Sequence, residues 1–258
     1  MSDSLYARNW AFIDASTQER LNSTTLFTAG TGLGSLIALL ATRTGFGRFI
    51  LADGDIVERS NLNRQAFTLR HLGHNKALAT ADLLAEIRTD LQVQTIPAFL
   101  TEDTLLAPIR ASDIVINTID FDDPVFLACN RIARAEGRTV LLPMNLGWGA
   151  ALYVFAPKSP TLEEVFAAEL QAGGPEAIKQ ELVVRALGQP HAYLDQPLAD
   201  FLAGKWRTDA QLGPAAFQAA ALTVAAAVAL VRGETLRTFP DPAVLDAWAA
   251  ATANGAKP

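Results

Sequence analysis

Short apolar runs alternate with longer apolar or amphipathic stretches through the first part of the chain. The runs TTLFTA and RFILA are typical of buried strands, and LIALLATR, which follows the first run, is typical of a helix. The pattern predicts strands at 24–29, 48–53, 92–97, 113–117, 139–143 and 150–156, and helices at 12–21, 33–44, 74–89, 102–110 and 123–136. This alternation predicts an α/β fold: a doubly wound, mostly parallel Rossmann-like sheet with helices on both faces.

The alternation ends near residue 157. From 158 to 212 the chain contains GG, GQP and DQP breaks and no clear period, so we expect an irregular region there. The Ala-rich tail after Pro242 is expected to form a terminal helix. These patterns divide the chain into a core at 1–157 and a second part at 158–258, whose C-terminal helices pack on the same domain.

The most apolar stretch lies at 215–231 and is close to the shortest length that spans a membrane. It is interrupted by Gln218, and it lies between start and stop signals, Gly213-Pro214 and Arg232-Gly233, that are typical of a helix in a water-soluble protein. We therefore expect a buried core or dimer-interface helix and no membrane span.

Composition narrows the class of protein. Half of the 258 residues are hydrophobic, enough for one large domain with a full core. The net charge of −6 argues against a nucleic-acid partner bound through a basic surface. The single cysteine, Cys129, excludes a disulfide framework and, with an N-terminus that lacks a signal-peptide pattern, predicts a cytoplasmic location.

A glycine-rich turn, GTGLGS, connects the first predicted strand to the following helix. Strand, glycine turn and helix within about thirty residues form the dinucleotide-fold fingerprint. Gly30, Gly32 and Gly34 let backbone N–H groups approach a phosphate, and the helix N-terminus adds partial positive charge. Asp53 ends the second strand about twenty residues later, where a carboxylate accepts hydrogen bonds from ribose hydroxyls.

A polar loop with the sequence ADGDIVERSNLNRQ follows the second strand, and GHNKA follows shortly after it. Arg64 and Lys76 supply two cations for a polyphosphate, so the pattern indicates a nucleotide site and favours ATP. Lys76 is alternatively a surface side chain with a buried stem, and Asp55 is either a ligand of the nucleotide or a solvated loop charge.

With these motifs the chain resembles the ThiF-type adenylyltransferases, relatives of ubiquitin-activating enzymes and of enzymes that activate sulfur-carrier proteins. The resemblance covers about residues 5–156 and weakly 213–233. The matching stretches are Tyr6-Ala7-Arg8, GTGLGS, ADGDIVERSNLNRQ, GHNKA and DIVINTID. Two family glycines are replaced, by Ala29 and Thr31, and a β-branched Thr31 stands where backbone normally closes on the nucleotide.

The resemblance implies roles for individual residues. Asn61, Arg64 and Gln65 would line the triphosphate, and Asp120, at the end of a strand, would hold Mg²⁺. Arg8 would enter the ATP site of a partner subunit, which implies a homodimer.

Other expectations concern residues beside these motifs. Unlike Asp120, Asp122 and Asp123 are interpreted as acidic residues at the N-terminus of the next helix, where the helix dipole favours negative charge. No Cys-x-x-Cys pair exists for the structural zinc of many relatives, and Cys129 is expected to be buried rather than to form a thioester.

The resulting hypothesis is an ATP- and Mg²⁺-dependent adenylyltransferase that releases pyrophosphate. Its substrate would be a C-terminal or side-chain carboxylate of a peptide or small ubiquitin-like protein, with Gly147 and Gly149 passing close to an extended tail. Residues 1–157 would be the ATP-binding adenylation core, and 158–212 would select the substrate. Two alternatives remain: a non-catalytic partner subunit of an activating enzyme, and an NAD-dependent dehydrogenase, which leaves Arg64 and Lys76 unexplained.

Overall fold

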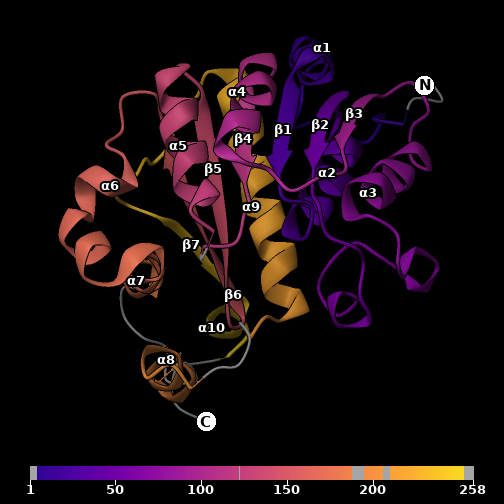
Figure 1. The fold of residues 1–258 in the computed structure, drawn as a ribbon. Helices are drawn as coiled ribbons and strands as arrows, with labels where there is room; N and C mark the ends of the chain where they lie inside the picture. The colour runs from indigo at the N-terminus through magenta and orange to yellow at the C-terminus, as the bar shows by residue number, and fades with distance from the viewer. Residues whose placement is uncertain (1–4, 122, 188–194, 206–209, 253–258) are drawn as a thin grey trace.

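A mixed β-sheet forms the centre of the molecule (Figure 1). The computed structural model describes residues 5–121, 123–187, 195–205 and 210–252. Within them the strand order is β3-β2-β1-β4-β5-β6-β7, with β1 to β5 parallel and β6 and β7 antiparallel to their neighbours. The strands are β1 (Thr25–Ala29), β2 (Arg48–Ala52), β3 (Gln92–Ile96), β4 (Ile114–Asn117), β5 (Thr139–Leu146), β6 (Gly149–Phe155) and β7 (Ala243–Asp246).

Helices cover both faces of the sheet, because successive strand residues point to opposite sides. Leu26 packs into one apolar cluster and its neighbour Phe27 into the other. The first face carries α1 (Ala15–Ser23), α2 (Leu33–Thr44), α3 (Lys76–Ala85) and α9 (Gly213–Arg232). The second carries α4 (Glu102–Ala111), α5 (Val125–Ala135), α6 (Leu162–Val165) and α7 (Ala167–Leu187). The predicted doubly wound, mostly parallel α/β fold is confirmed.

The topology sets the place for a ligand. β1 lies between β2 and β4; the chain passes from β1 to β2 and β3 on one side and then crosses to β4 on the other, which reverses the strand order at β1. Ala29 is in register with both Ala52 and Asn117, so the three strands end at the same level. Ligands of open α/β sheets bind outside the carboxyl ends of the strands at such a switch point.

Several helix and strand ends differ from the predicted ones, and side-chain caps or strand pairing explain them. The first helix begins at Ala15 rather than 12, because the Asp14 carboxylate accepts from the backbone N–H of Thr17 at 2.7 Å. This bond is the main cause that lowers the pKa of Asp14 to about 2. In the same way Asn75 caps α3, and β5 extends to Leu146 because it pairs with β6 through a tight hairpin.

The second part of the chain is more regular than its sequence suggests. The region expected to be irregular contains α6, α7 with a break at Gly174 (φ 69°), and α8 (Asp195–Leu202). The tail after Pro242 forms β7 before the short helix α10 (Ala247–Ala251). Pairing of β7 with the edge of β6 overrides local helix propensity there, and this pairing is a tertiary contact that the local pattern does not contain.

Helix α9 is the one helix of the described residues that is long and apolar enough, by length and composition, to cross a membrane. It packs along the sheet against β5, β6 and α2 (Figure 1). The side chains buried in this contact are mainly small; they are Ala215, Ala216, Ala219, Ala220, Thr223, Val224, Ala226 and Ala227. This packing matches the predicted core helix.

Candidate functional site

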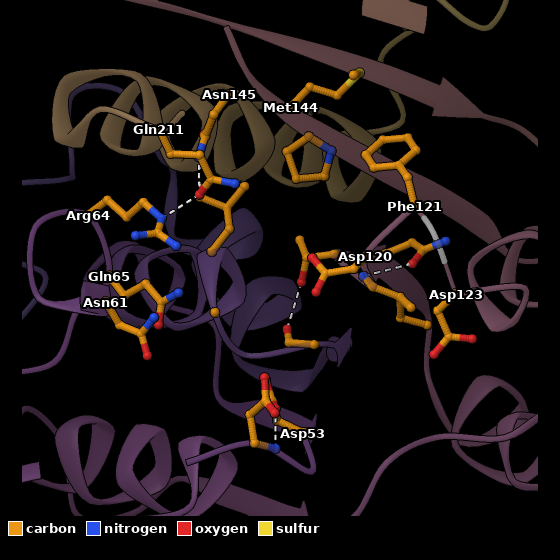
Figure 2. A pocket seen from close by; sticks show the side chains of 18 of the residues that line it. Asp53, Asn61, Arg64, Gln65, Asp120, Phe121, Asp123, Met144, Asn145 and Gln211 are labelled. Carbon is orange, nitrogen blue, oxygen red and sulfur yellow. Dashed lines mark hydrogen bonds between the residues drawn. The ribbon is translucent and has the colours of Figure 1, made fainter. Parts of the chain in front are cut away.

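A cavity of about 780 Å³ opens at the carboxyl ends of β1, β2 and β4. Its volume lies within the range of about 300–1,000 Å³ that is usual for small-molecule sites. The glycine turn and the 52–65 loop line the cavity, together with residues of α7, α8 and the segment before α9. Figure 2 shows Arg64 and Gln211 next to each other in its wall. The cavity therefore brings together both predicted parts of the chain.

The glycine turn needs two of its three glycines for packing. Gly30 has a φ of 91°, and a Cβ there would lie 2.6 Å from the carbonyl oxygen of Thr118. A Cβ on Gly34 would lie 2.3 Å from the Thr28 methyl group, so this glycine lets α2 approach β1. Gly30 and Gly32 line the cavity, whereas Gly34 does not and acts through this packing.

Replacing Gly30 with alanine should lower the free energy of unfolding by about 2–3 kcal/mol, from left-handed backbone strain plus the clash. Gly137 is a matched control, since it also has a positive φ, 67°, but open space at its Cβ position. Gly137→Ala should cost only the strain, about 1 kcal/mol. Urea unfolding of both variants measures the difference, and equal losses would contradict the packing argument.

Asp53 lies at the end of β2 and lines the cavity, as predicted. Its Oδ2 accepts from the backbone N–H of Thr31 at 2.6 Å and from the Thr31 hydroxyl at 3.1 Å, and its Oδ1 accepts from the N–H of Asp55 at 2.9 Å. The Thr31 side chain is fully buried and is not part of the cavity wall. The threonine therefore orients Asp53 and leaves Oδ1 with capacity for a ribose hydroxyl.

We expect Thr31→Val to weaken ATP binding about five-fold, the equivalent of one lost hydrogen bond to a carboxylate that must stay oriented. Thr31→Ser should restore the affinity because it restores the hydroxyl. Isothermal titration calorimetry with ATP measures both variants. Unchanged or tighter binding by Thr31→Val would mean that the hydroxyl does not position Asp53.

Lys76 is buried at the start of α3 and faces the cavity. Its side chain is 10% exposed, and Nζ donates to Asp55 Oδ2 at 2.9 Å. The alternative of a surface lysine is therefore wrong. Asp55, which the sequence left between ligand and solvated charge, is the half-exposed ion-pair partner that neutralises Lys76.

Arg64 is held by a residue that sequence reasoning missed. Its Nε donates to Gln211 Oε1, and its Nη1 donates to the carbonyl of Ser60 and to Asn63 Oδ1, both at 2.9 Å (Figure 2). Gln211 lies two residues before α9, about 150 residues further along the chain than Arg64. Asn145 donates to the same oxygen at 3.5 Å. This contact joins the polar loop to the segment before α9.

The two amides of the loop have different surroundings. Asn61 is buried, and its Oδ1 accepts from the N–H of Glu58 at 2.9 Å, which caps the short 3₁₀ helix η1 (Arg59–Asn61). Gln65 packs against Gly32, and its buried Oε1 has no hydrogen-bond partner among the described residues. Both line the cavity, and their binding roles stay predictions.

Asp120 follows β4, is exposed and lines the cavity near its centre (Figure 2). The described residues contain no cluster of three side chains suited to a metal, so a divalent cation here would need phosphate oxygens beside Asp120. Asp123 also lines the cavity, and its Oδ1 accepts from the N–H of Val125, which matches its predicted place at a helix N-terminus. Asp122 lies outside the described residues.

Two further expectations, for Arg8 and Cys129, concern residues that do not line the cavity. Arg8 is exposed between Tyr6 and Asn9, which donate to carbonyls at the C-terminal end of α2, at the sheet edge opposite the cavity. It does not line its own chain's cavity, and a role in a partner's site stays a prediction. Cys129 is fully buried, and burial raises the pKa of its thiol to about 12, as expected for a non-nucleophilic cysteine.

The expectation for Gly149 is wrong. A Cβ on this residue would lie 2.5 Å from the carbonyl oxygen of Leu245, so the backbone that passes close to it is the chain's own β7. Gly147 does line the cavity and remains available to a bound tail.

Comparison with known proteins gives consistent matches along the chain. The model of the ThiF family matches residues 6–252. The sulfur carrier protein ThiS adenylyltransferase of Escherichia coli (strain K12) is 28% identical over 149 residues, 54% of this chain and 56% of that protein. The SAMP-activating enzyme E1 of Haloferax volcanii is 29% identical over 147 residues, 56% of this chain and 52% of that protein. The chain thus spans about half the length of these curated relatives.

Solved structures share the fold over nearly the whole chain. The crystal structure of PaaA has a TM-score of 0.68 at 21% identity and covers 94% of this chain and 78% of that one. A structure of Escherichia coli MccB with MccA-N7isoASN has a TM-score of 0.67 at 19% identity and covers 95% and 72%. At these identities the similarity shows the fold alone.

Proposed function

The chain belongs to the ThiF family, and from this premise we propose that it activates a carboxylate by adenylation, with ATP as co-substrate and Mg²⁺ as cofactor. One observation carries the proposal: Arg64 and Lys76 enter the same cavity as Asp53 and Asp120, at the carboxyl edge of the sheet. Carboxylate, cation and backbone donors arranged in this way match a nucleoside, its phosphates and a leaving group.

In the proposed reaction a carboxylate oxygen attacks the α-phosphorus of ATP. A new O–P bond forms, the P–O bond to the bridging oxygen between the α- and β-phosphates breaks, and pyrophosphate leaves with that electron pair. The attacking carboxylate is already ionised near neutral pH, so no general base is needed. The protein contributes position and charge stabilisation.

Each predicted site residue of the cavity has a task in this scheme. Asp53 accepts from the ribose, and the turn at Gly30 and Gly32 with the N-terminus of α2 faces the phosphates. Arg64 and Lys76 neutralise charge that builds on the leaving pyrophosphate, beside the amides of Asn61 and Gln65. Mg²⁺ held by Asp120 would supply further neutralisation of the phosphate oxygens.

The proposed partners are a peptide or small ubiquitin-like protein as substrate and a second copy of the chain. Relatives of the chain bear the names of enzymes that act on sulfur-carrier and ubiquitin-like proteins, which supports this substrate class. A homodimer would bring the partner's Arg8 to the cavity, since the chain's own Arg8 lies at the far end of the sheet.

The test is ATP–pyrophosphate exchange by the purified protein with Mg²⁺ and candidate carboxylate peptides. We expect exchange that requires both a peptide and Mg²⁺. ATP binding without exchange for any peptide would favour the non-catalytic partner subunit. Tight NADH binding without ATP binding would favour the dehydrogenase alternative, which family membership leaves without support.

A further inference from the structure

Part of the cavity wall consists of bulky apolar side chains. Phe121, Leu142, Met144, Val183 and Phe201 all line it, and we refer to these five residues as the apolar compartment. Val183 lies on α7 and Phe201 on α8, both from the second part of the chain, whereas Phe121 follows Asp120 directly. Phe121 packs on Phe126 with ring centroids 4.4 Å apart, which fixes this wall beside Asp120. Of the residues that the proposed function assigns to the nucleotide, Asp120 adjoins this compartment, whereas Asp53 and Arg64 lie apart from Phe121 (Figure 2).

The side chain of Lys179 places a positive charge beside the apolar compartment. Lys179 lines the cavity four residues before Val183, so the two share one face of α7. Its ammonium lies 5.5 Å from the centroid of the Phe201 ring, a cation–π contact that holds positive charge against an apolar wall. Among the described residues, the other cations that line the cavity are Arg64 and Lys76, and both come from the first part of the chain.

We propose, on the basis of the adenylation function above, that the acceptor is a carboxylate flanked by a bulky apolar side chain. Lys179 binds the carboxylate, and the apolar side chain enters the apolar compartment. A carboxylate that leaves water needs a cation nearby, and Lys179 is a cation of the cavity wall beside Phe201. A Gly-Gly tail has no side chain to fill the compartment, so this site disfavours the tail of a ubiquitin-like protein and favours a short peptide.

Peptide binding in the presence of a non-hydrolysable ATP analogue and Mg²⁺ tests the preference. The probes are Ac-Ala-Ala-Ala-Ala-Leu and Ac-Ala-Ala-Ala-Gly-Gly, both with free C-termini. A second pair carries Glu-Leu or Gln-Leu inside an amidated peptide, which separates side-chain from C-terminal carboxylates. We expect a leucine-bearing carboxylate to bind about 10- to 100-fold more tightly than the Gly-Gly tail. Two results would overturn the proposal. In the first, the Gly-Gly peptide binds as tightly as the leucine peptide or more tightly. In the second, the Glu-Leu and Gln-Leu peptides bind equally and the peptide with the free C-terminal Leu does not bind.

Five variants show which residues cause the preference. Lys179→Gln should weaken the preferred peptide at least ten-fold, Lys179→Arg should restore it, and Lys158→Gln, an exposed lysine away from the cavity, should not change it. Val183→Asn should reduce the leucine preference, whereas Val184→Asn should not, because Val184 is 45% exposed and lies outside the cavity wall. Unchanged peptide affinity in Lys179→Gln would overturn the role of this lysine.

The outcomes also separate this inference from the proposed function. The proposed function gives Lys179 and Val183 no task in ATP binding, so the dissociation constant for ATP should change less than two-fold in variants of these two residues. Loss of ATP binding in the unmodified protein would contradict the proposed function. Normal ATP binding without the peptide preference would contradict only the inference about the acceptor.

Discussion

Replacing Lys76 with methionine should lower the rate of ATP–pyrophosphate exchange by about two to three orders of magnitude, the cost of removing one group that stabilises transition-state charge. The Lys76 side chain is 10% exposed, so its charge acts on the phosphates through little water. Methionine keeps much of the length and packing of the lysine stem but has no charge. Exchange at saturating ATP and peptide measures the effect directly.

The loss should appear in turnover more than in ATP affinity, because charge accumulates on pyrophosphate as the P–O bond breaks. Lys158→Met, at an exposed site outside the cavity, is the matched control. Thermal unfolding within a few degrees of the unmodified protein would show that the fold persists, as expected when the remaining partner, Asp55, is half exposed. A Lys76→Met protein with exchange above one tenth of the original rate would contradict the assignment.

Much of the fold could be predicted because buried parallel strands have short, continuous apolar sequences. β1, β2 and β4 and the helix α9 were predicted within a few residues, since burial and helix stop signals act through adjacent residues. β7 could not be predicted in this way. It forms because the edge of β6 is open to pairing, and this pairing joins segments about ninety residues apart.

The same distinction holds for the site. Asp53, Asn61, Arg64 and Gln65 were found because they follow one strand in one loop, so sequence proximity already implies spatial proximity. Gln211 and Lys179 come from segments with no motif. The Gly213-Pro214 start signal placed Gln211 just before a helix, but no local signal shows that this helix end faces Arg64. No sequence pattern indicates that the Thr31 side chain is buried against Asp53 either, because the two residues lie on different segments.

Arg64→Ala should lower exchange by about 100-fold or more, because the variant lacks a cation that the proposed function uses to neutralise charge on the leaving pyrophosphate. Arg64→Lys should recover only part of the activity, since lysine keeps the charge but not the planar fork. Gln211→Ala should cost less, about five-fold, the value of one hydrogen bond that holds the guanidinium. Exchange rates and the KM for ATP of the three variants are the measurements. Full activity in Arg64→Ala would refute the proposed role of this arginine.

A double-mutant cycle then decides how Gln211 acts. If the amide works only by orienting Arg64, the Arg64→Ala/Gln211→Ala protein should be no slower than Arg64→Ala alone, because nothing remains to be oriented. If Gln211 touches the substrate itself, the two losses should multiply. The structure favours the first result, since Gln211 Oε1 accepts from Arg64 Nε while Asn145 donates to the same oxygen from the opposite segment. In that case the segment before α9 positions the phosphate-binding arginine, and the second part of the chain serves the nucleotide as well as the acceptor.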